Sequence, residues 1–306
     1  MNFREFSADV IKSVNTCLGN DVKAEVKKVI KNNGVELHGL IISMAQSGIS
    51  PTIYLDGFYR EYKQGKSLGD IVYEIVTIYE KNKVSIDINL DFFLDYQEVK
   101  GRIFTKAVHY EKNKKMLEDV PHICFMDLAV ICYYAYMNDF LGKGSIQIET
   151  GHLDRWGISQ EELFETAKKN TKNKLGVEIK GMDELLIEMM LESEKDVDRD
   201  ELEAMLQRAE KEVPMYIMTL KGRYFGAACI YYEEMLASFG KQCGKSFYIL
   251  PSSIHELILV PDSGKEKPEE LRRMVREVNA GHVAPEERLS DNIYYYDLLE
   301  GRLHMF

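Results

Sequence analysis

The sequence predicts an α+β protein of two modules, in which mixed or antiparallel sheets carry helices packed on one face. Three observations lead to this class. The chain has 306 residues, 45% hydrophobic and 29% charged, which is enough for two domains with cores of their own. Asn33-Gly34 separates two extended patterns, which is a strong hairpin signal. In the C-terminal half the element order ββαββα plus a final strand favours an antiparallel sheet.

The N-terminal module is expected to cover residues 1–115. The segments Asp21–Lys31 and Val35–Met44 form the two strands of the hairpin, because Asn and Gly between them tolerate positive φ. Ile49–Leu55 is expected to be a third strand. A helix precedes the hairpin, since apolar residues recur at helical spacing: Phe3, Phe6, Val10, Ile11 and Val14.

Two further helices are expected in this module. The first ends near Gln64, where Gly65 is placed to terminate it. The second begins at Ser67, which resembles a capping box with Asp70. Its apolar face is predicted from residues at helical spacing: Leu68, Ile71, Val72, Ile75, Val76 and Tyr79.

The next stretch, residues 84–142, is harder to assign. Ile86–Tyr96 has a helical pattern, Arg102–Tyr110 an extended one, and Glu111–Leu117 that of a short helix. The apolar run Ile123–Met137 is predicted to be a buried core element, with strand favoured at its start because aromatic and β-branched residues are frequent there. It contains Asp127 and is too short to cross a bilayer.

The C-terminal module is expected to cover residues 116–306. Ser145–Glu149 is predicted to be a strand, and Ser159 with Glu162 matches the capping box at the start of a helix. An acidic helical segment then spans residues 183–212, with 12 acidic against 4 basic residues.

The last elements have the clearest pattern. Met215–Leu220 and Tyr224–Tyr231 are predicted to form a second hairpin around Lys221-Gly222. Strands Ser246–Leu250 and Ile254–Val260 follow a short helix. A helix beginning at Pro268 and a final strand, Asn292–Tyr296, complete the chain, and the helix is expected to bury Leu271, Met274, Val275 and Val278.

Composition excludes several classes of protein. The net charge is −11 and no basic stripe is present, which argues against nucleic-acid or membrane partners. The first nine residues mix charges where a signal peptide needs an apolar run. The five cysteines form no CxxC pair and three lie in apolar runs, as expected for reduced thiols. We therefore expect a cytoplasmic protein.

Chemistry is most concentrated in the stretch Pro251–Asp262. Ser253 and His255 are the candidate catalytic residues, since they would share one face of a strand. Ser252 and Glu256 are candidate binding residues, but Glu256 points to the opposite face and cannot orient the imidazole. A hydrolase would therefore need another carboxylate, such as Asp262 or Asp291, and an oxyanion hole.

Tyrosines supply two more candidate binding residues. Tyr231 and Tyr295 belong to clusters in which neighbouring rings face opposite sides of a strand, and an exposed tyrosine suits a protein or ligand contact. The small residues Gly226-Ala227-Ala228 indicate close packing.

Three apparent motifs do not predict sites. Glu149, His152 and Asp154 lack the second E-x-x-H copy of a di-iron site. The run that begins at Asp196 lacks the glycine and the final glutamate of a calcium loop. Gly142–Ser145 lacks the spacing of a phosphate loop. No metal and no cofactor is expected.

Several longer phrases resemble an uncharacterised family of bacterial proteins, a domain of unknown function common in anaerobic Gram-positive bacteria. The resemblance covers nearly the whole chain and implies no reaction, ligand or catalytic residue. It is carried by Asn33–Leu40, Ser50–Tyr59, Val120–Val130, Gly226–Tyr231, Leu250–Asp262 and Met274–Tyr296.

We therefore expect a non-catalytic binding or regulatory module that contacts a protein partner or a small-molecule ligand through the C-terminal sheet and its polar turn. The alternative is a hydrolase-like enzyme with its site at Pro251–Glu256.

Overall fold

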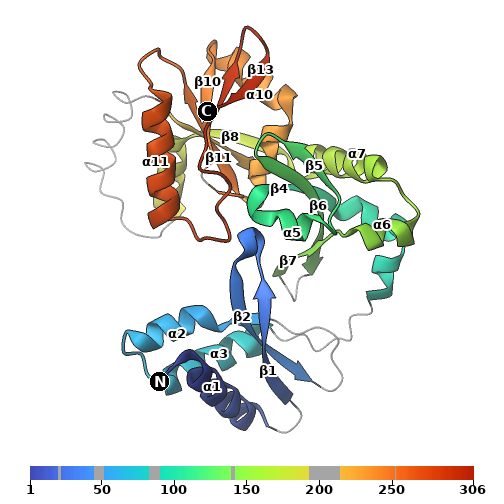
Figure 1. Ribbon diagram of the computed structural model, residues 1–306, viewed down its shortest axis with the longest axis vertical. Helices are drawn as coiled ribbons and strands as arrows, with labels where there is room; N and C mark the ends of the chain where they lie inside the picture. The colour runs from blue at the N-terminus through green and yellow to red at the C-terminus, as the bar shows by residue number, and fades with distance from the viewer. Residues whose placement is uncertain (20–21, 45–51, 83–89, 139–141, 193–213, 252) are drawn as a thin grey trace. The chain divides into compact units, whose positions relative to one another are not determined.

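A computed structural model describes residues 1–306 except 20–21, 45–51, 83–89, 139–141, 193–213 and 252 (Figure 1). The chain forms two compact units, which we describe separately. The first comprises residues 1–99 and 135–146, and the second comprises residues 100–134 and 147–306. The expected modules divided the chain at residue 115. In the structure, the strand that precedes this position belongs to the second unit because it pairs with a later strand of that unit.

The first unit is built on an antiparallel sheet in the order β1-β2-β3. The predicted hairpin is confirmed: Val22 pairs with Met44 at one end and Ile30 with Glu36 at the other, and Asn33 has a φ of 60°. The elements are α1 (Phe3–Leu18), β1 (Val22–Ile30), β2 (Glu36–Met44), β3 (Thr52–Tyr54), α2 (Leu55–Lys63), α3 (Leu68–Asn82) and α4 (Tyr96–Val99).

The helices of this unit supply one side of its core. Ser67 accepts a hydrogen bond from the Asp70 N–H at the start of α3, as the capping pattern predicted. His38 on β2 contacts Asp56 on α2 twice, through its backbone N–H at 2.7 Å and its Nδ1 at 2.9 Å. The core combines α1, the sheet, the first residue of α2 and α3: Phe6, Val10, Val14, Leu40, Ile42, Leu55, Ile71 and Ile75.

The second unit contains two sheets, and the smaller has the order β4-β6-β5. β7 also pairs with β6, although residues 135–146, which include the end of β6 and nearly all of β7, are assigned to the first unit. The apolar run is strand, as favoured, but it is two strands rather than one element. Met126 and Asp127 form the turn between them, because Phe125 pairs with Leu128. The elements are β4 (Ile103–His109), α5 (Lys114–Leu117), β5 (His122–Phe125), β6 (Leu128–Asn138), β7 (Gly142–Gln147), α6 (Thr150–Trp156) and α7 (Gln160–Asn170).

The larger sheet is antiparallel throughout and has the order β13-β12-β10-β11-β9-β8. Its final strand, β13, is not among the predicted elements. The elements are β8 (Val177–Gly181), α8 (Met182–Glu192), β9 (Tyr216–Leu220), the 3-10 helix η6 (Gly226–Tyr231), α10 (Glu233–Cys243), β10 (Phe247–Leu250), β11 (Glu256–Pro261), α11 (Pro268–Gly281), β12 (Tyr294–Asp297) and β13 (Arg302–Met305).

The predicted second hairpin is wrong, because Tyr224–Tyr231 is not a strand. Arg223 and Phe225 have positive φ, which turns the chain away from an extended path into η6. Gly226 lies so close to β9 and the His255 carbonyl that a Cβ there would stand 2.3 Å from the Thr219 hydroxyl. The close packing inferred from the small residues is present, but β9 pairs with β8 and β11 instead.

Helices cover both faces of the larger sheet, which departs from the expected single face. Val275 of α11 packs with Tyr248, whereas Phe239 of α10 lies 4.9 Å from Phe247, ring centroid to centroid. Because neighbours on a strand point to opposite faces, α10 and α11 lie on opposite sides.

The buried stripe of α11 also differs from the prediction. Met274 and Val278 are 45% and 37% exposed, while Asn279 is 1% exposed. Leu271, Val275 and Asn279 therefore form the inward stripe, at a spacing of four residues.

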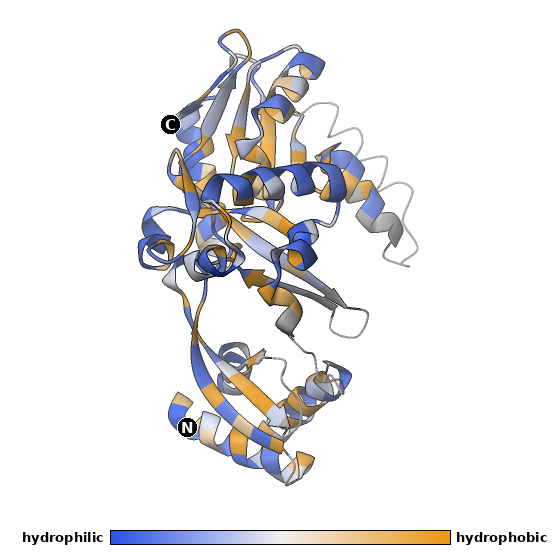
Figure 2. Cartoon of the chain, turned by 90° about the vertical axis from the view of Figure 1, so that its right-hand side faces the viewer, coloured by the Kyte–Doolittle hydropathy of each residue, from blue (hydrophilic) through white to orange (hydrophobic). Residues whose placement is uncertain are grey.

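The α+β class is confirmed, and Figure 2 shows hydrophobic segments along the strands and hydrophilic ones along much of the helices. None of the helices in the described part of the chain is long and apolar enough to cross a membrane.

Candidate functional site

The polar turn at residues 251–256 is the first candidate site. Ser253 and His255 lie in a bend before β11, not on the strand as expected. Ser253 is buried, and its hydroxyl oxygen accepts a hydrogen bond from the His255 backbone N–H at 3.0 Å. This is the local hydrogen bond of a serine turn, and it shapes the chain entering β11.

The His255 imidazole is held on both sides. Its Nδ1 lies 3.2 Å from the Phe225 N–H and accepts from it, so the neutral ring carries its proton on Nε2. Nε2 lies 3.6 Å from Glu287 Oε1, and Phe225 stacks on the ring at 8° and 5.5 Å. Burial lowers the pKa of His255, and Glu287 partly opposes that effect. The carboxylate near the ring is Glu287, rather than Asp262 or Asp291.

This geometry gives Ser253 and His255 structural partners but does not form a nucleophile–base pair. The hydroxyl contacts the backbone of His255, and Nδ1 of the ring contacts the backbone of Phe225. A catalytic role for Ser253 and His255 stays a prediction.

The other candidates near the larger sheet also have structural positions. Glu256 begins β11 and pairs with Thr219. Tyr295 donates its hydroxyl hydrogen to Asp262 Oδ2 at 2.9 Å and lies against Tyr248. Ser252 lies outside the described residues.

Tyr231, by contrast, lines a cavity. Its ring meets Phe125 edge-on at 5.6 Å, and the Lys168 ammonium lies 5.6 Å from the ring centroid. The cavity has a volume of about 220 Å³ and runs along one flank of α7. We call it the α7 groove, and it is lined by Ile123, Gln160, Glu161, Phe164, Glu165, Lys168 and Tyr231.

The α7 groove joins an apolar floor to a charged rim. Phe164 is 6% exposed and forms the floor with Ile123, while Glu161 and Glu165 are exposed carboxylates. Hydrogen bonds from its own backbone N–H and from Ser159 lower the pKa of Glu161. Burial, with Glu165 adding to it, raises the pKa of Tyr231. Both groups therefore hold their ordinary charge states at neutral pH.

The position of α7 explains how these residues come together. Ser159 caps the helix by accepting from the Glu162 N–H at 3.2 Å, as predicted. Asn170, at the other end, donates to the carbonyl of Ile103 at the start of β4. Residues three and four apart lie on the same side of a helix. Once both ends of α7 are fixed, Glu161, Phe164, Glu165 and Lys168 therefore all face the groove. In the sequence, these residues have the pattern of an ordinary charged helix face, which does not by itself indicate a groove.

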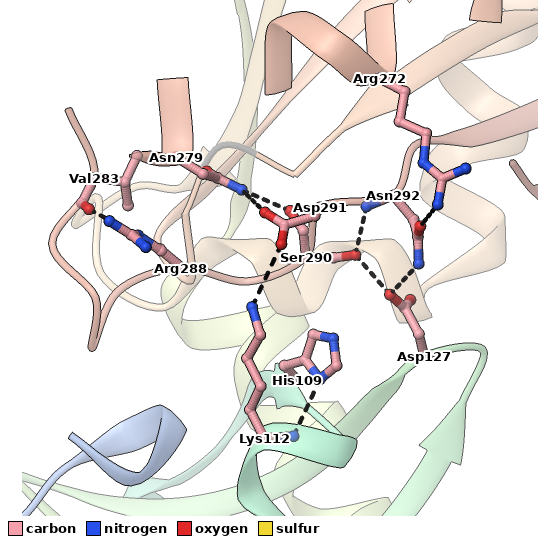
Figure 3. Close-up of polar contacts among 10 residues, drawn as sticks. All are labelled: His109, Lys112, Asp127, Arg272, Asn279, Val283, Arg288, Ser290, Asp291 and Asn292. Carbon is pink, nitrogen blue, oxygen red and sulfur yellow. Dashed lines mark hydrogen bonds and ion pairs between the residues drawn. The ribbon is translucent and has the colours of Figure 1, made fainter. Parts of the chain in front are cut away.

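A second polar cluster surrounds Asp127 in the turn between β5 and β6 (Figure 3). Asp127 Oδ2 accepts from the Ser290 hydroxyl at 2.6 Å and from the Asn292 side-chain amide at 3.0 Å, while Asp127 Oδ1 accepts from the Tyr294 hydroxyl at 2.6 Å. Arg272 on α11 donates to Asn292 Oδ1 at 2.6 Å. We call this set the Asp127 network.

The Asp127 network joins distant segments of the second unit. Ser290 and Tyr294 are both fully buried, and burial raises the pKa of Tyr294 well above its usual value. His109 and Lys112 lie beside the Asp127 network, and the Lys112 ammonium lies 3.7 Å from Asp291 Oδ2 (Figure 3). Asp127 was visible in the sequence as a charge inside an apolar run, and such a charge needs several hydrogen bonds when it is not in water. Its role here is structural.

The weaker motifs have local explanations. The Glu149 N–H donates to His152 Nδ1 at 2.9 Å, which caps α6, and Gly142–Ser145 lies in β7. The run at Asp196–Asp200 lies outside the described residues. Among the residues that are described, no three His, Cys, Asp or Glu side chains are grouped to hold a metal.

A larger cavity belongs to the first unit. It measures about 460 Å³ and lies between α1 and α3, where the Tyr73 side chain is 75% exposed. Its walls are mainly apolar, and they include Cys17, Leu68, Val72 and Val76.

The chain is an α+β protein of two units, and in two polar clusters, the turn at His255 and the Asp127 network, the polar groups bond to one another or to the backbone. A family model matches residues 3–298, and the chain belongs to that family, a family of unknown function (DUF5688). No curated protein and no solved structure matches the chain.

Proposed function

We propose that this protein is a non-catalytic binding or regulatory module that recognises a protein partner through the α7 groove. One observation carries the proposal. Tyr231, one of the binding candidates, lines a cavity of the second unit. The Tyr295 hydroxyl donates to Asp262 within the larger sheet, and the Glu256 backbone pairs with Thr219 at the start of β11.

The size and chemistry of the α7 groove favour a protein over a small molecule. Sites that enclose drug-sized ligands measure about 300–1,000 Å³. At about 220 Å³, the groove holds one or two side chains of a partner. An aromatic anchor within a charged rim is the composition found in protein interfaces. We include a cytoplasmic location in the proposal, because Cys132 and Cys229 are free, buried thiols.

Selection of phage-displayed random peptides on the full chain tests the proposal. We expect enriched peptides that bind the Tyr231→Ala variant about 30-fold more weakly, since an interface tyrosine contributes about 2 kcal/mol. Tyr231→Phe keeps the ring and should bind normally. Peptides that bind wild type and Tyr231→Ala equally would place the binding surface elsewhere.

Two carboxylates of α7 provide a matched control for the groove. Glu165 lines it, whereas Glu162 is exposed on another side of the same helix. Glu165→Lys should change the affinity of the selected peptides and Glu162→Lys should not. Equal effects of the two substitutions would indicate a response to net charge only, and would count against the groove.

A further inference from the structure

The outer edge of β5 lies beside the α7 groove and has backbone groups directed away from the sheet. β5 ends its sheet, with β6 as its partner on one side. A two-residue turn closes on a hydrogen-bonded pair, here Phe125 and Leu128, so every second residue of β5 turns its N–H and C=O outward. These residues are His122 and Cys124.

One contact confirms this orientation. The Gln160 side-chain amide donates to the His122 carbonyl at 3.1 Å, so this carbonyl points away from β6 and toward the start of α7. The Cys124 side chain is exposed. Among the described residues, no strand pairs with this edge of β5.

β5 also lacks the charged side chains that protect many edge strands. Natural edges carry charged side chains that discourage a further strand. At the edge of the larger sheet, β8 has Glu178 and Lys180, whose charged atoms lie 3.3 Å apart. The four residues of β5 are His-Ile-Cys-Phe, without Lys, Arg, Asp or Glu.

The side chains of an added strand would reach the groove. Ile123 lines it, and Phe125, on the same face of β5, contacts Tyr231. A strand beside β5 would place every second side chain on this face, toward Phe164 and the carboxylates Glu161 and Glu165. Backbone pairing at an edge together with pockets for alternate side chains is the arrangement of strand-addition recognition.

We infer that the partner of the α7 groove is an extended peptide segment that adds to the outer edge of β5 as a strand. Its groove-facing side chains are apolar and basic: the apolar one contacts Ile123 and Phe164, and the basic one pairs with Glu161 or Glu165. This inference rests on the proposed function, because it specifies how the same groove is used.

Defined synthetic peptides test the mode of binding on the full chain. The probe is the acetylated heptapeptide Val-Thr-Lys-Thr-Val-Thr-Lys, in which every second residue is Val or Lys so that both side-chain types lie on one face of the strand. It is labelled for fluorescence anisotropy, and its charge-reversed control has Glu in place of Lys. We expect the Lys peptide to bind at least 10-fold more tightly. A series of peptides each carries one N-methyl group, placed at successive positions. Binding should be lost in every second peptide of the series, because only alternate N–H groups of the added strand face β5. The remaining methylated peptides should bind normally.

A pair of substitutions at Cys124 tests the protein side. Cys124→Pro removes the outward N–H without removing a hydrogen bond to β6, and it should weaken binding at least 10-fold. Cys124→Val keeps the N–H and should bind normally. In case the proline disturbs β5, hydrogen exchange of the wild-type chain gives a second readout: the peptide should slow exchange at Cys124.

The outcomes separate the inference from the proposed function. Binding that needs Tyr231 but shows no alternation with N-methylation, and no protection at Cys124, would overturn strand addition and leave the proposed function standing. If neither selected nor designed peptides need Tyr231, the proposed function fails. A wild-type dimer that Cys124→Pro converts to a monomer in sedimentation would show that a second copy of the chain covers the edge, which would also overturn the inference.

Discussion

The turn at His255 and the α7 groove at Tyr231 belong to the same unit, and each places an aromatic ring beside charged groups. At the turn, both imidazole nitrogens face partners within the chain, and a stacked Phe225 covers one side of the ring. In the groove, Tyr231 borders a volume of about 220 Å³. A concentration of reactive residue types therefore does not indicate a site when those groups satisfy one another.

The Asp127 network extends this comparison, and its removal should have the largest effect. Asp127→Ala leaves the buried Ser290 and Tyr294 hydroxyls without their acceptor, so we expect the free energy of unfolding to fall by about 3–5 kcal/mol. Urea denaturation measures it. Asp127→Asn, which keeps one acceptor oxygen, should lose less. A change below about 0.5 kcal/mol for Asp127→Ala would contradict a structural role.

Tyr231→Ala should separate binding from stability. Its side chain lies at the rim of a cavity, so we expect a loss of unfolding free energy of about 1 kcal/mol, smaller than the loss of about 2 kcal/mol in binding. Denaturation and anisotropy on the same preparation give both values. A stability loss well above the binding loss would make Tyr231 a core residue.

His255→Ala should show the reverse pattern. The Phe225 N–H loses its acceptor and the stacked ring is removed, so the free energy of unfolding should fall by about 1–2 kcal/mol, while peptide affinity stays at the wild-type value. Turnover of a panel of ester substrates is the contrasting measurement. Activity that is lost in His255→Ala without a loss of stability would support the hydrolase alternative.

The smallest effect concerns pH. Burial lowers the pKa of His255 in the folded state, so the unfolded chain binds the proton more readily. The stabilisation from neutral His255 is complete above the unfolded pKa of about 6.5 and is lost as the pH falls through that value toward the folded pKa. Between pH 7 and 5, wild type should therefore lose more stability than His255→Ala. Equal slopes in thermal unfolding would show that the ring environment is not perturbed.

Local patterns predicted the elements that depend on neighbouring residues. The Asn33-Gly34 hairpin and the helix starts at Ser67 and Ser159 have the expected geometry, because turn and capping preferences act within a few residues. The strand predicted at Tyr224–Tyr231 was wrong because Gly226 packs against Thr219 and the His255 carbonyl. That contact joins segments far apart in the chain, and no local pattern contains it.

The candidate site, too, was predictable only in part from local sequence. A contact role for Tyr231 was predicted from its cluster, but Ile123 on β5 and Phe164 on α7 lie far from it in sequence, and only the packing of these elements places them beside it. The charged flank of α7 had the pattern of any solvated helix. Likewise, Asp127 was visible as a charge in an apolar run, while its three donors come from residues 290–294.

By itself, the sequence determined the α+β class, the first hairpin, most strands and helices, and the absence of a familiar catalytic motif. The tertiary structure decided which polar groups are satisfied inside the chain and which border a cavity. The physical reason is that backbone preferences and hydrophobic periodicity act locally, whereas a hydrogen-bond partner or a groove wall is supplied by whichever distant segment packs alongside.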